Sequence, residues 1–525
     1  MQSCTMCVMY MAAKMPAKVS TVRRYSEVRT SGMFGVEPQE ITVQVHLTTG
    51  LPAFHIVGLG DTAVKESNRR VTAALKNSGF RVPDGVITVN LAPALDSKSG
   101  TGFDLAIALG ILFADGVLPK DSFINHIVIG ELGLNGRISN VRGMVGAGML
   151  AHQKGRALVC ADASSFDGML DLSVLELKHL SDLHNLAELV HVQKSTSVPA
   201  SDLSHLSNQE DFIDVVGQDQ AIRALTIAAA GQHNIFMVGP PGTGKTMLAS
   251  RLPSILPALD AEELVESALV FSVAGMPFDQ RLRMRPFRAP HHSATTAAIV
   301  GGGNPVRPGE VSLAHNGVLF LDEMPQFSRA TLQSLRQPIE DRAVRVVRAQ
   351  GSYTFPSNFM LVGAANPCPC GYLGDRYKNC RCLPNQIELH QNKIGGPLID
   401  RFDLFVTVPR PNPDRFFEKG RSRQAAYSSK ELAQEVAQAR AFADFHGRGS
   451  VHSLRRQQLC QQDLMDKKAL NLLRKAAHSL KLSGRSIMGT LRLSRTIADL
   501  ALCEQVTAAH LSEALTYRKV WGAQE

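Results

Sequence analysis

No run of about 18 consecutive apolar residues occurs in this chain of 525 residues, so we expect no membrane-spanning helix. The chain also begins without a positively charged segment followed by a continuous apolar stretch, which argues against a secretory signal peptide. We interpret residues 1–20 as a tail or a mis-assigned start. No tandem repeat is present either.

An evenly spread, even-numbered set of cysteines is also missing. Of the nine cysteines, four cluster between Cys368 and Cys382, and Cys160, Cys460 and Cys503 stand alone. A disulfide framework is therefore not expected, and the pattern indicates a reducing compartment. We expect a cytoplasmic protein.

Acidic residues are in the minority, and the formal net charge is +9. Residues 401–525 hold 21 Lys and Arg against 12 Asp and Glu, so the excess lies in this C-terminal part. A basic C-terminal module could face nucleic acid. A solvated helical surface is the other interpretation of the same charges.

Length and patterning predict three folded parts. Alternating strand-like and helical stretches predict a mixed α/β or α+β domain over residues 21–192, and a Ser-rich linker follows at 193–210. A nucleotide-binding module is expected at 211–413 and a helical module at 414–525. The expected helices are 64–78, 103–113, 431–446, 463–482, 485–505 and 508–520, and the expected strands include 41–47, 86–91 and 126–129.

A phosphate-binding loop is the strongest single motif. It follows the apolar run 234–238 and fits G-x-x-x-x-G-K-[ST] with Gly239, Pro240, Pro241, Gly242, Thr243, Gly244, Lys245 and Thr246. Glycines allow backbone N–H groups to turn toward phosphate oxygens, Lys245 can reach the β and γ phosphates, and Thr246 can hold Mg²⁺. The following helix adds its positive end. The motif predicts binding and hydrolysis of a nucleotide.

Two further strands are expected to end at the same carboxyl edge of a parallel sheet. The strand in 317–323 ends at Asp322 and Glu323, and the strand in 359–365 ends at Asn366. Asp322 would hold Mg²⁺, and Glu323 would orient or deprotonate the attacking water. Asn366 could bond the γ-phosphate or that water, or it could be a turn residue before Pro367.

Arg401 follows in the segment GGPLIDRFDL, beside two acids. From its surroundings alone it is as well explained by a salt bridge as by catalysis.

The order of motifs GPPGTGKT, FRAPHHSAT, GVLFLDE, GAANPCPCGY and GPLIDRFDL resembles the Mg-chelatase-like AAA+ ATPases, specifically the ComM group, also called YifB. The resemblance extends to IVGLGDTAVKESNRRV, VNLAPA and RTIADLA, and so covers nearly the whole chain after the tail. It implies a hexameric ATP-driven motor with Mg²⁺. The implied role is DNA helicase or branch migration on single-stranded or branched DNA in natural transformation and recombination, with recombination proteins as partners.

The resemblance also implies roles for individual residues. Asn366 becomes the first sensor, Arg401 the arginine finger acting on a neighbouring subunit, and Arg485 the second sensor. Arg492 and Arg495 are then structural. The stretch from Ser486 to Gly489 departs from the aromatic and histidine-containing sequence usual in this group, which weakens the local match.

Two inserts are expected to reach a central pore. The first, Ala289–Gly309, resembles the helix-two insertion of this clade, and the second, Arg342–Phe355, has the pattern of a hairpin that turns near Gln350. Arg345 and Arg348 could contact DNA phosphates there or be exposed hairpin charges. His291 and His292, in the first insert, are expected to be structural.

Cys368, Cys370, Cys380 and Cys382 form two C-x-C pairs separated by nine residues. Four thiolates on a short loop can enclose tetrahedral Zn²⁺. Disulfides and free thiols are the alternatives, and a reducing compartment disfavours the disulfides.

The first domain resembles the Lon protease catalytic domain, related to the second domain of ribosomal protein S5. That resemblance places the Ser and Lys of the protease dyad at Gly102 and Val145 of this chain, neither of which can act as nucleophile or base. Ser99 and Thr101, in the nearby segment Lys98–Leu105, could replace the nucleophile, but no Lys lies at the base position. We therefore expect a scaffold, assembly or DNA-contacting domain.

Two other functions remain open from sequence. One is a motor subunit of a metal chelatase that acts with protein partners. The other is an ATP-dependent protease or unfoldase.

Overall fold

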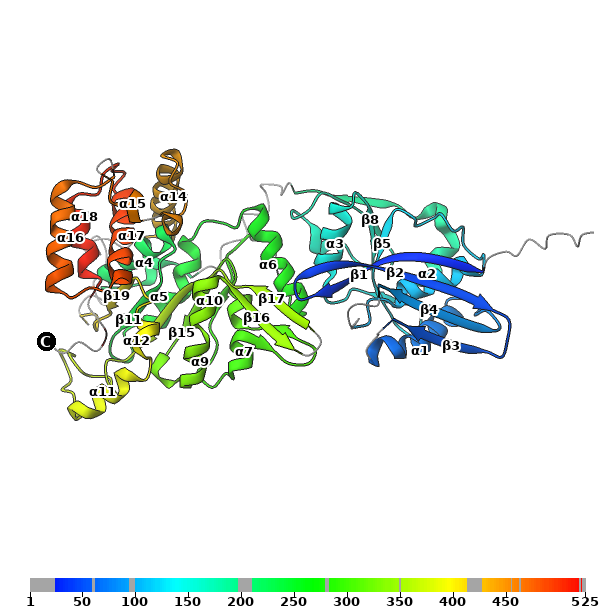
Figure 1. The fold of residues 1–525 in the computed structure, drawn as a ribbon, viewed down its shortest axis with the longest axis horizontal. Helices are drawn as coiled ribbons and strands as arrows, with labels where there is room; N and C mark the ends of the chain where they lie inside the picture. Colours follow the sequence, from blue (N-terminus) through cyan, green and yellow to red (C-terminus); the bar gives the residue numbers. More distant parts are fainter. Residues whose placement is uncertain are drawn as a thin grey trace, which may run out of the picture.

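The computed structural model describes residues 24–58, 62–93, 100–196, 210–278, 283–348, 351–412, 427–454, 456–461, 464–518 and 521. The tail 1–20, most of the linker, Lys98, Ser99 and the hairpin turn at Gln350 lie outside them. The described residues form three parts arranged along the long axis of the molecule (Figure 1). No helix among them is both long and apolar enough to cross a membrane.

The N-terminal part combines two four-stranded sheets with three helices. The sheet orders are β1-β2-β4-β3 and β10-β9-β8-β5. The strands are β1 Tyr25–Phe34, β2 Glu37–Thr48, β3 Ala53–Val57, β4 Val86–Ala92, β5 His126–Val128, β6 Glu131–Leu132, β7 Ile138–Ser139, β8 Ala157–Cys160, β9 Leu172–Glu176 and β10 His191–Lys194. The helices are α1 Thr62–Asn77, α2 Asp104–Ala114 and α3 Met144–Gln153.

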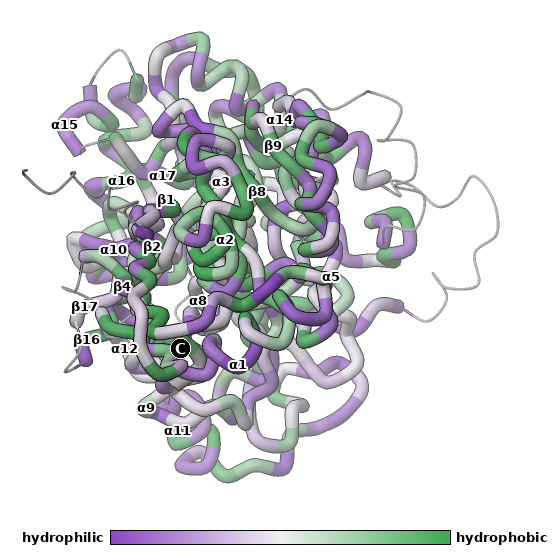
Figure 2. Tube along the Cα trace, turned by 90° about the vertical axis from the view of Figure 1, so that its right-hand side faces the viewer, coloured by the Kyte–Doolittle hydropathy of each residue, from purple (hydrophilic) through white to green (hydrophobic). Residues whose placement is uncertain are grey.

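Helix α2 is apolar on all sides, so it must be buried all round. Every one of its residues is buried, and Figure 2 shows it mostly green. Its one charged residue, Asp104, is paired with Arg70 of α1 at 2.6 Å. The pair fixes α1 against α2.

The central part is built around a parallel sheet with the strand order β12-β15-β18-β11-β19. These strands are Phe287–Arg288, Val318–Leu321, Met360–Ala365, Ile235–Val238 and Leu404–Thr407, and their apolar runs are typical of strands covered on both faces. The remaining elements are α4 Asp219–Gly231, α5 Lys245–Arg251, α6 Ala261–Ala274, α7 Thr296–Val300, β13 Gly301–Gly302, β14 Arg307–Pro308, α8 Glu310–Leu313, α9 Arg329–Ser334, α10 Arg336–Asp341, β16 Ala343–Arg348, β17 Gly351–Pro356, α11 Pro384–Asn392 and α12 Gly396–Ile399. The parallel sheet predicted from sequence is present.

The C-terminal part is helical, as expected, and packs on α4. Its helices are α14 Ser429–Phe445, α15 Arg456–Leu459, α16 Lys467–Ser479, α17 Gly484–Leu500 and α18 Ala508–Thr516. Leu432, Leu493 and Ala514 from three of these helices share one apolar core with α4 and the central sheet. The C-terminal part is thus fixed to the strand that precedes the phosphate loop.

Helix α17 ends five residues earlier than the predicted boundary at 505. Leu502 has φ +52°, a left-handed conformation that ends a helix. Arg495, only 1% exposed, donates to the carbonyl oxygens of Cys503 and Glu504 and pairs with Asp499. Arg495 is therefore structural, as the sequence indicated.

The N-terminal part shares a core with the central part. Leu264, Ala268 and Leu269 of α6 pack with Val145 and Leu150 of α3 in one apolar cluster. The expected hairpin also forms, as β16 and β17 pair in antiparallel register. Its end contacts the same N-terminal part, because Tyr353 stacks on Phe34 at 4.6 Å between ring centroids.

Candidate nucleotide site

The phosphate loop runs from the end of β11 to the start of α5. Gly242 and Gly244 have φ +74° and +89°, and a Cβ at either position would meet no atom within 4 Å. Gly239 faces backbone instead, since a Cβ there would lie 2.1 Å from the carbonyl oxygen of Val408. Left-handed backbone needs glycine, and it turns successive N–H groups to one side. The open side of the loop fits a phosphate chain.

Lys245 is buried beneath this loop. Its Nζ donates to the carbonyl oxygens of Gly239 at 2.8 Å and Pro240 at 2.9 Å, and to Asn366 Oδ1 at 3.2 Å. Burial lowers the pKa of Lys245, while Asp322 and Glu323 act against this shift. The ammonium group is therefore held by the loop's own oxygens at the position expected for phosphate contact.

Thr246 and Asp322 meet at the first turn of α5. Thr246 Oγ1 donates to Asp322 Oδ2 at 2.7 Å, and the other oxygen of Asp322 accepts from the backbone N–H of Glu323 at 2.8 Å. A hydroxyl and a carboxylate side by side are the oxygen donors that Mg²⁺ takes in such sites. The residues present thus fit the magnesium ion that the motif implies.

Glu323 is placed differently from Asp322. Its side chain is 57% exposed, and its backbone has φ +46° and ψ +44°, an unusual conformation for glutamate. His292 Nδ1 lies 3.9 Å from its carboxylate. This neighbour could not be predicted, because the two residues lie in different motifs.

Strand order explains why Asn366 joins the site. Strand β18 lies between β11 and β15, so its carboxyl end lies between the phosphate loop and the two acids. Asn366 follows that end directly and contacts Lys245. The structure thus brings together five predicted residues from three strand ends: Lys245, Thr246, Asp322, Glu323 and Asn366.

The two predicted arginines lie together at a different place. Arg401 pairs with Glu340 of α10 at 2.7 Å, and Arg485 pairs with the same carboxylate oxygen. Burial acts to raise the pKa of Glu340, but hydrogen bonds from Arg485 and Arg401 keep this pKa below its usual range. Glu340 was not predicted, because a single glutamate on an amphipathic helix carries no motif.

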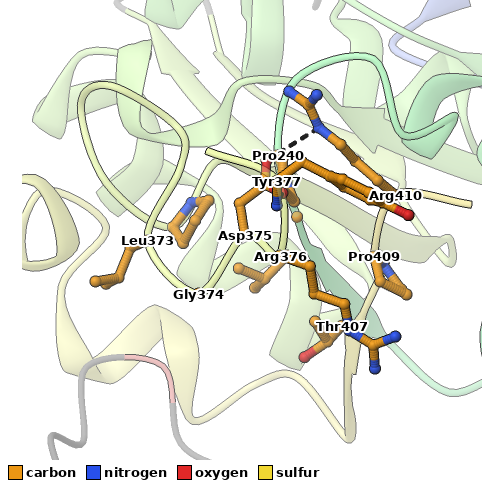
Figure 3. A pocket seen from close by; sticks show the side chains of 12 residues that line it. Pro240, Leu373, Gly374, Asp375, Arg376, Tyr377, Thr407, Pro409 and Arg410 are labelled. Carbon is orange, nitrogen blue, oxygen red and sulfur yellow. Dashed lines mark hydrogen bonds and ion pairs between the residues drawn. The ribbon is translucent and has the colours of Figure 1, made fainter. Parts of the chain in front are cut away.

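A pocket of about 130 Å³ borders the phosphate loop at Pro240 (Figure 3). Tyr377, Asp375 and Arg410 line it, and the dashed line in the figure marks the ion pair of Asp375 with Arg410 at 3.0 Å. Behind it the cysteine loop contacts the phosphate loop, since a Cβ on Gly371 would lie 2.7 Å from Pro241 Cδ. The two loops are therefore packed against each other.

The four clustered cysteines converge. Cys368 Sγ lies 3.4 Å from Cys370 Sγ, Cys380 Sγ lies 3.6 Å from both, and Cys382 Sγ accepts from the Cys370 N–H at 3.4 Å. Tetrahedral Zn²⁺ at its usual Zn–S distance of about 2.3 Å would space the sulfurs about 3.8 Å apart. Backbone hydrogen bonds from Arg381 and Tyr372 lower the pKa of Cys370 to about 6. The cluster fits a zinc ion.

The phosphate loop lies on a five-stranded parallel sheet. Two acids follow β15, and an amide follows β18, the strand between β11 and β15. This combination defines a P-loop ATPase of the AAA+ class. Three family models match successive parts of the chain: magnesium chelatase subunit ChlI at 211–416, subunit ChlI of Mg-chelatase at 43–164, and the ChlI C-terminal model at 426–518. The chain belongs to the YifB and ComM family of Mg-chelatase-like AAA+ ATPases, as the sequence motifs predicted.

Full-length relatives support this membership. The chain is 38% identical to the uncharacterized protein YifB of Salmonella typhimurium and 39% identical to the competence protein ComM of Haemophilus influenzae. Each match covers 94% of this chain and 97% of the relative. A more distant match, 22% identical over 65% of this chain and 36% of the relative, is the DNA replication licensing factor mcm6 of Schizosaccharomyces pombe. Family membership implies ATP and Mg²⁺ as ligands.

Proposed function

We propose that this protein is an ATP-hydrolysing motor that works as a homo-hexamer on single-stranded or branched DNA, as a helicase or branch-migration enzyme in natural transformation and homologous recombination. One observation carries the proposal. Lys245, Asp322, Glu323 and Asn366 form half of a hydrolysis site, and the arginine such a site needs is held at Glu340. A ring in which Arg401 serves the neighbouring subunit completes the site.

Each residue has a distinct task in this scheme. The loop N–H groups and Lys245 bind the β and γ phosphates of ATP, and Asn366 aligns the γ-phosphate or the attacking water. Glu323 accepts the proton of that water. Bound Mg²⁺, held by Thr246 and Asp322, neutralises phosphate charge. Arg401 and Arg485 of the adjacent subunit would stabilise the negative charge of the transition state.

Two observations support DNA as the substrate of the proposed motor. One related chain is named a DNA replication licensing factor, mcm6, and another is named a competence protein, ComM. On this chain, Arg345 and Arg348 are exposed on one strand of the β16–β17 hairpin, where they can meet phosphates of a strand passing through a ring.

We further propose a Lon-protease-like fold without peptidase chemistry for residues 21–192. Gly102 has no side chain to supply a nucleophile, and Val145 is buried in an apolar core with no titratable group of its own. Residues 211–413 would be the motor domain and 414–525 its helical lid. The N-terminal part would then be a scaffold that moves with α6.

The Cys368–Cys382 loop is proposed to hold structural zinc. It packs on the phosphate loop and lies between Asn366 and Arg401 in the chain, so the ion would stiffen the link between sensor and finger. Zinc content would be measured in the purified chain and in Cys380→Ser, with Cys460→Ser as a control outside the cluster. Equal zinc in all three would contradict the proposal.

The deciding experiment measures ATPase rate with single-stranded, duplex and four-way-junction DNA, together with native mass. We expect a hexamer with ATP and a rate that rises with single-stranded or junction DNA. A rate unmoved by every DNA would overturn the DNA motor.

The chelatase family models favour one alternative, a metal-chelatase motor subunit that acts with protein partners. It predicts the same ATP hydrolysis, with stimulation by protein partners instead of DNA. The third function, an ATP-dependent protease or unfoldase, would require ATP-dependent loss of casein, for which this chain has no dyad at Gly102 and Val145.

A further inference from the structure

A second group of metal-ligand side chains lies away from the cysteine loop. His233 stands between α4 and β11, Asp403 stands just before β19, and His452 belongs to the 3-10 turn Val451–Ser453 of the C-terminal part. Their potential ligand atoms all lie within 4.8 Å of one another. His233 Nδ1 is 3.6 Å from Asp403 Oδ2, and the two histidine rings are 5.3 Å apart at their centroids.

One buried ring nitrogen of each histidine makes no hydrogen bond with the protein. His233 Nδ1 and His452 Nε2 are buried and have no hydrogen-bond partner. His233 is 0% exposed, so water cannot satisfy it from bulk solvent. A buried polar atom without a partner is costly, and in native proteins it commonly marks an ion or an ordered water.

The His233 ring is held in one orientation. Its Nε2 bonds Thr496 Oγ1 of α17 at 2.8 Å, which directs Nδ1 toward the other two side chains. A Cβ on Gly231 would lie 2.3 Å from His233 Nε2, so the chain makes room for this ring. Metal-bound histidines commonly use the second nitrogen in this way.

Asp403 is also oriented. Its Oδ2 accepts from the backbone N–H of Asn234 at 3.2 Å, and its carbonyl oxygen accepts from Arg518 at 3.0 Å. A cavity of about 90 Å³, lined by His452, Asn234 and Arg342 among others, adjoins the group. This space can hold a water molecule as a further ligand.

We propose that His233, Asp403 and His452 bind a divalent transition-metal ion, with zinc as the best chemical match. Two imidazole nitrogens and one carboxylate oxygen form a common zinc ligand set, and water completes the tetrahedron. The ion would draw ligand atoms now up to 4.8 Å apart to about 3.3 Å, the spacing that bonds of about 2.0–2.1 Å require.

Positive charge nearby sets the strength of this site. Arg342 and Arg492 face His452, and Arg518 faces Asp403. Arg492 and Arg518 direct donors to carbonyl oxygens of His452, Phe402 and Asp403. The ion therefore binds more weakly here than four thiolates would bind it, and metal must be supplied in excess in any test.

The ion would join the central and C-terminal parts. Asp403 lies two residues after Arg401, and Thr496, which orients His233, lies on α17. Binding would tie the turn that carries Arg401 to the helices of the C-terminal part. The inference needs only these contacts and does not depend on the proposed DNA motor.

Cobalt binding to the full chain tests the site. Cobalt is titrated into metal-stripped protein in which Cys368, Cys370, Cys380 and Cys382 are all replaced by Ser, and the visible spectrum and bound metal are recorded. We expect one cobalt per chain, with a visible spectrum that lacks the intense near-ultraviolet band of cobalt–thiolate bonds. Absence of bound cobalt, or a spectrum with that thiolate band, would overturn the site.

Variants of His452 complete the test. In the same background, His452→Asn is expected to lose the cobalt, whereas exposed His478→Asn keeps it. In the chain with all its cysteines, His452→Asn should remove one equivalent and leave the thiolate band. Circular dichroism checks that each variant is folded, and cobalt retained by a folded His452→Asn chain would contradict the assignment.

Discussion

The two neighbouring acids at the end of β15 differ in exposure and are therefore suited to different tasks. Asp322 uses both oxygens within the protein, one toward Thr246 and one toward the Glu323 N–H. Glu323 has a mostly exposed carboxylate on a left-handed backbone, with His292 as its neighbour. A fixed carboxylate suits ion binding, and a freer one suits proton transfer.

Glu323→Gln keeps the shape of the side chain and removes its basicity. We expect the ATP hydrolysis rate to fall roughly 100-fold or more, with ATP affinity nearly unchanged, because general bases of this kind contribute that much to rate. Turnover and equilibrium binding of ATP are measured on the same preparation. The control is Glu262→Gln, an exposed acid on α6, and a Glu323→Gln chain that hydrolyses at the normal rate would exclude Glu323 as the base.

His126 predicts an acid sensitivity of the N-terminal part. Burial of the ring, and then the nearby His191, lower its pKa to about 4. This pKa of the folded chain lies below the usual value near 6.5, so the unfolded chain binds the proton more readily. The free energy of unfolding is therefore undiminished above pH 6.5 and falls as the pH drops toward 4. Between pH 7.5 and pH 5 the unmodified chain should lose about 1–2 kcal/mol more than His126→Leu.

Urea unfolding followed by circular dichroism at both pH values measures this difference. Exposed His55→Leu, in the same part of the chain, serves as the control. An unmodified chain and a His126→Leu chain that lose equal stability on acidification would show that the ring is not responsible.

Residues of the nucleotide site could be predicted because their roles are encoded locally. Lys245, Thr246, Asp322 and Asn366 each follow an apolar strand, and parallel strand ends meet at one edge of the sheet. Glu340 could not be predicted, since only the packing of α10 brings it to Arg401 and Arg485. His233 and His452 are 219 residues apart, and no spacing rule connects them.

At the scale of elements, helix α6 links two parts of the molecule. Its N-cap is Asp260, whose side chain accepts from the Glu263 N–H while the Glu263 side chain accepts from the Asp260 N–H. One face of the helix then packs on α3. A well-capped helix is a stiff connector, because its first turn does not fray.

Asp260→Ala removes this cap. We expect the free energy of unfolding to fall by about 1 kcal/mol, the usual cost of an N-cap loss. Asp466→Ala is a matched control, because Asp466 is the N-cap of α16 but makes no cap hydrogen bond from its side chain. Urea unfolding compares the two, and equal losses would contradict the role of the α6 capping box.

Element types were predictable where periodicity was strong, and boundaries were less so. The expected helix at 103–113 and strand at 86–91 agree with α2 and β4 to within one residue. The end of α17 was misplaced because it depends on the left-handed Leu502 and on carbonyls bound by Arg495, which are tertiary features. The contact of Tyr353 with Phe34 could not be predicted, because it joins two half-buried strand residues that are far apart in the sequence.

At the scale of the whole molecule, two contacts among several join the N-terminal part to elements of the proposed motor. One is the shared apolar cluster of α3 and α6, and the other is the stacking of Phe34 on the hairpin. The hairpin carries the arginines proposed to meet DNA. A displacement of the hairpin by moving DNA would therefore be transmitted directly to the N-terminal part.

Mixing two inactive variants tests the shared site. Lys245→Ala lacks the phosphate contact and Arg401→Ala lacks the finger, so each alone should hydrolyse ATP very slowly. In rings mixed in equal amounts, about a quarter of interfaces pair an intact loop with an intact arginine, because each interface in a head-to-tail ring joins two different surfaces. The ATPase rate of the mixture should thus recover to about a quarter of normal.

Native mass spectrometry confirms that subunits have exchanged. In the control mixture, Arg336→Ala takes the place of Arg401→Ala. Arg336 is also an arginine and lies on α10. Exchange without any recovery of the rate would show that Arg401 does not act on a neighbouring subunit.

Glu340 gives Arg401 and Arg485 an anion of their own within a single subunit. A phosphate that approaches either guanidinium competes with that carboxylate for the same N–H donors. In the proposed ring, docking of one subunit on the ATP of the next is then an anion exchange, in which nucleotide phosphate displaces an internal carboxylate. A solitary subunit keeps both cations bound to one carboxylate, and ATP bound by its neighbour becomes the ligand that releases them.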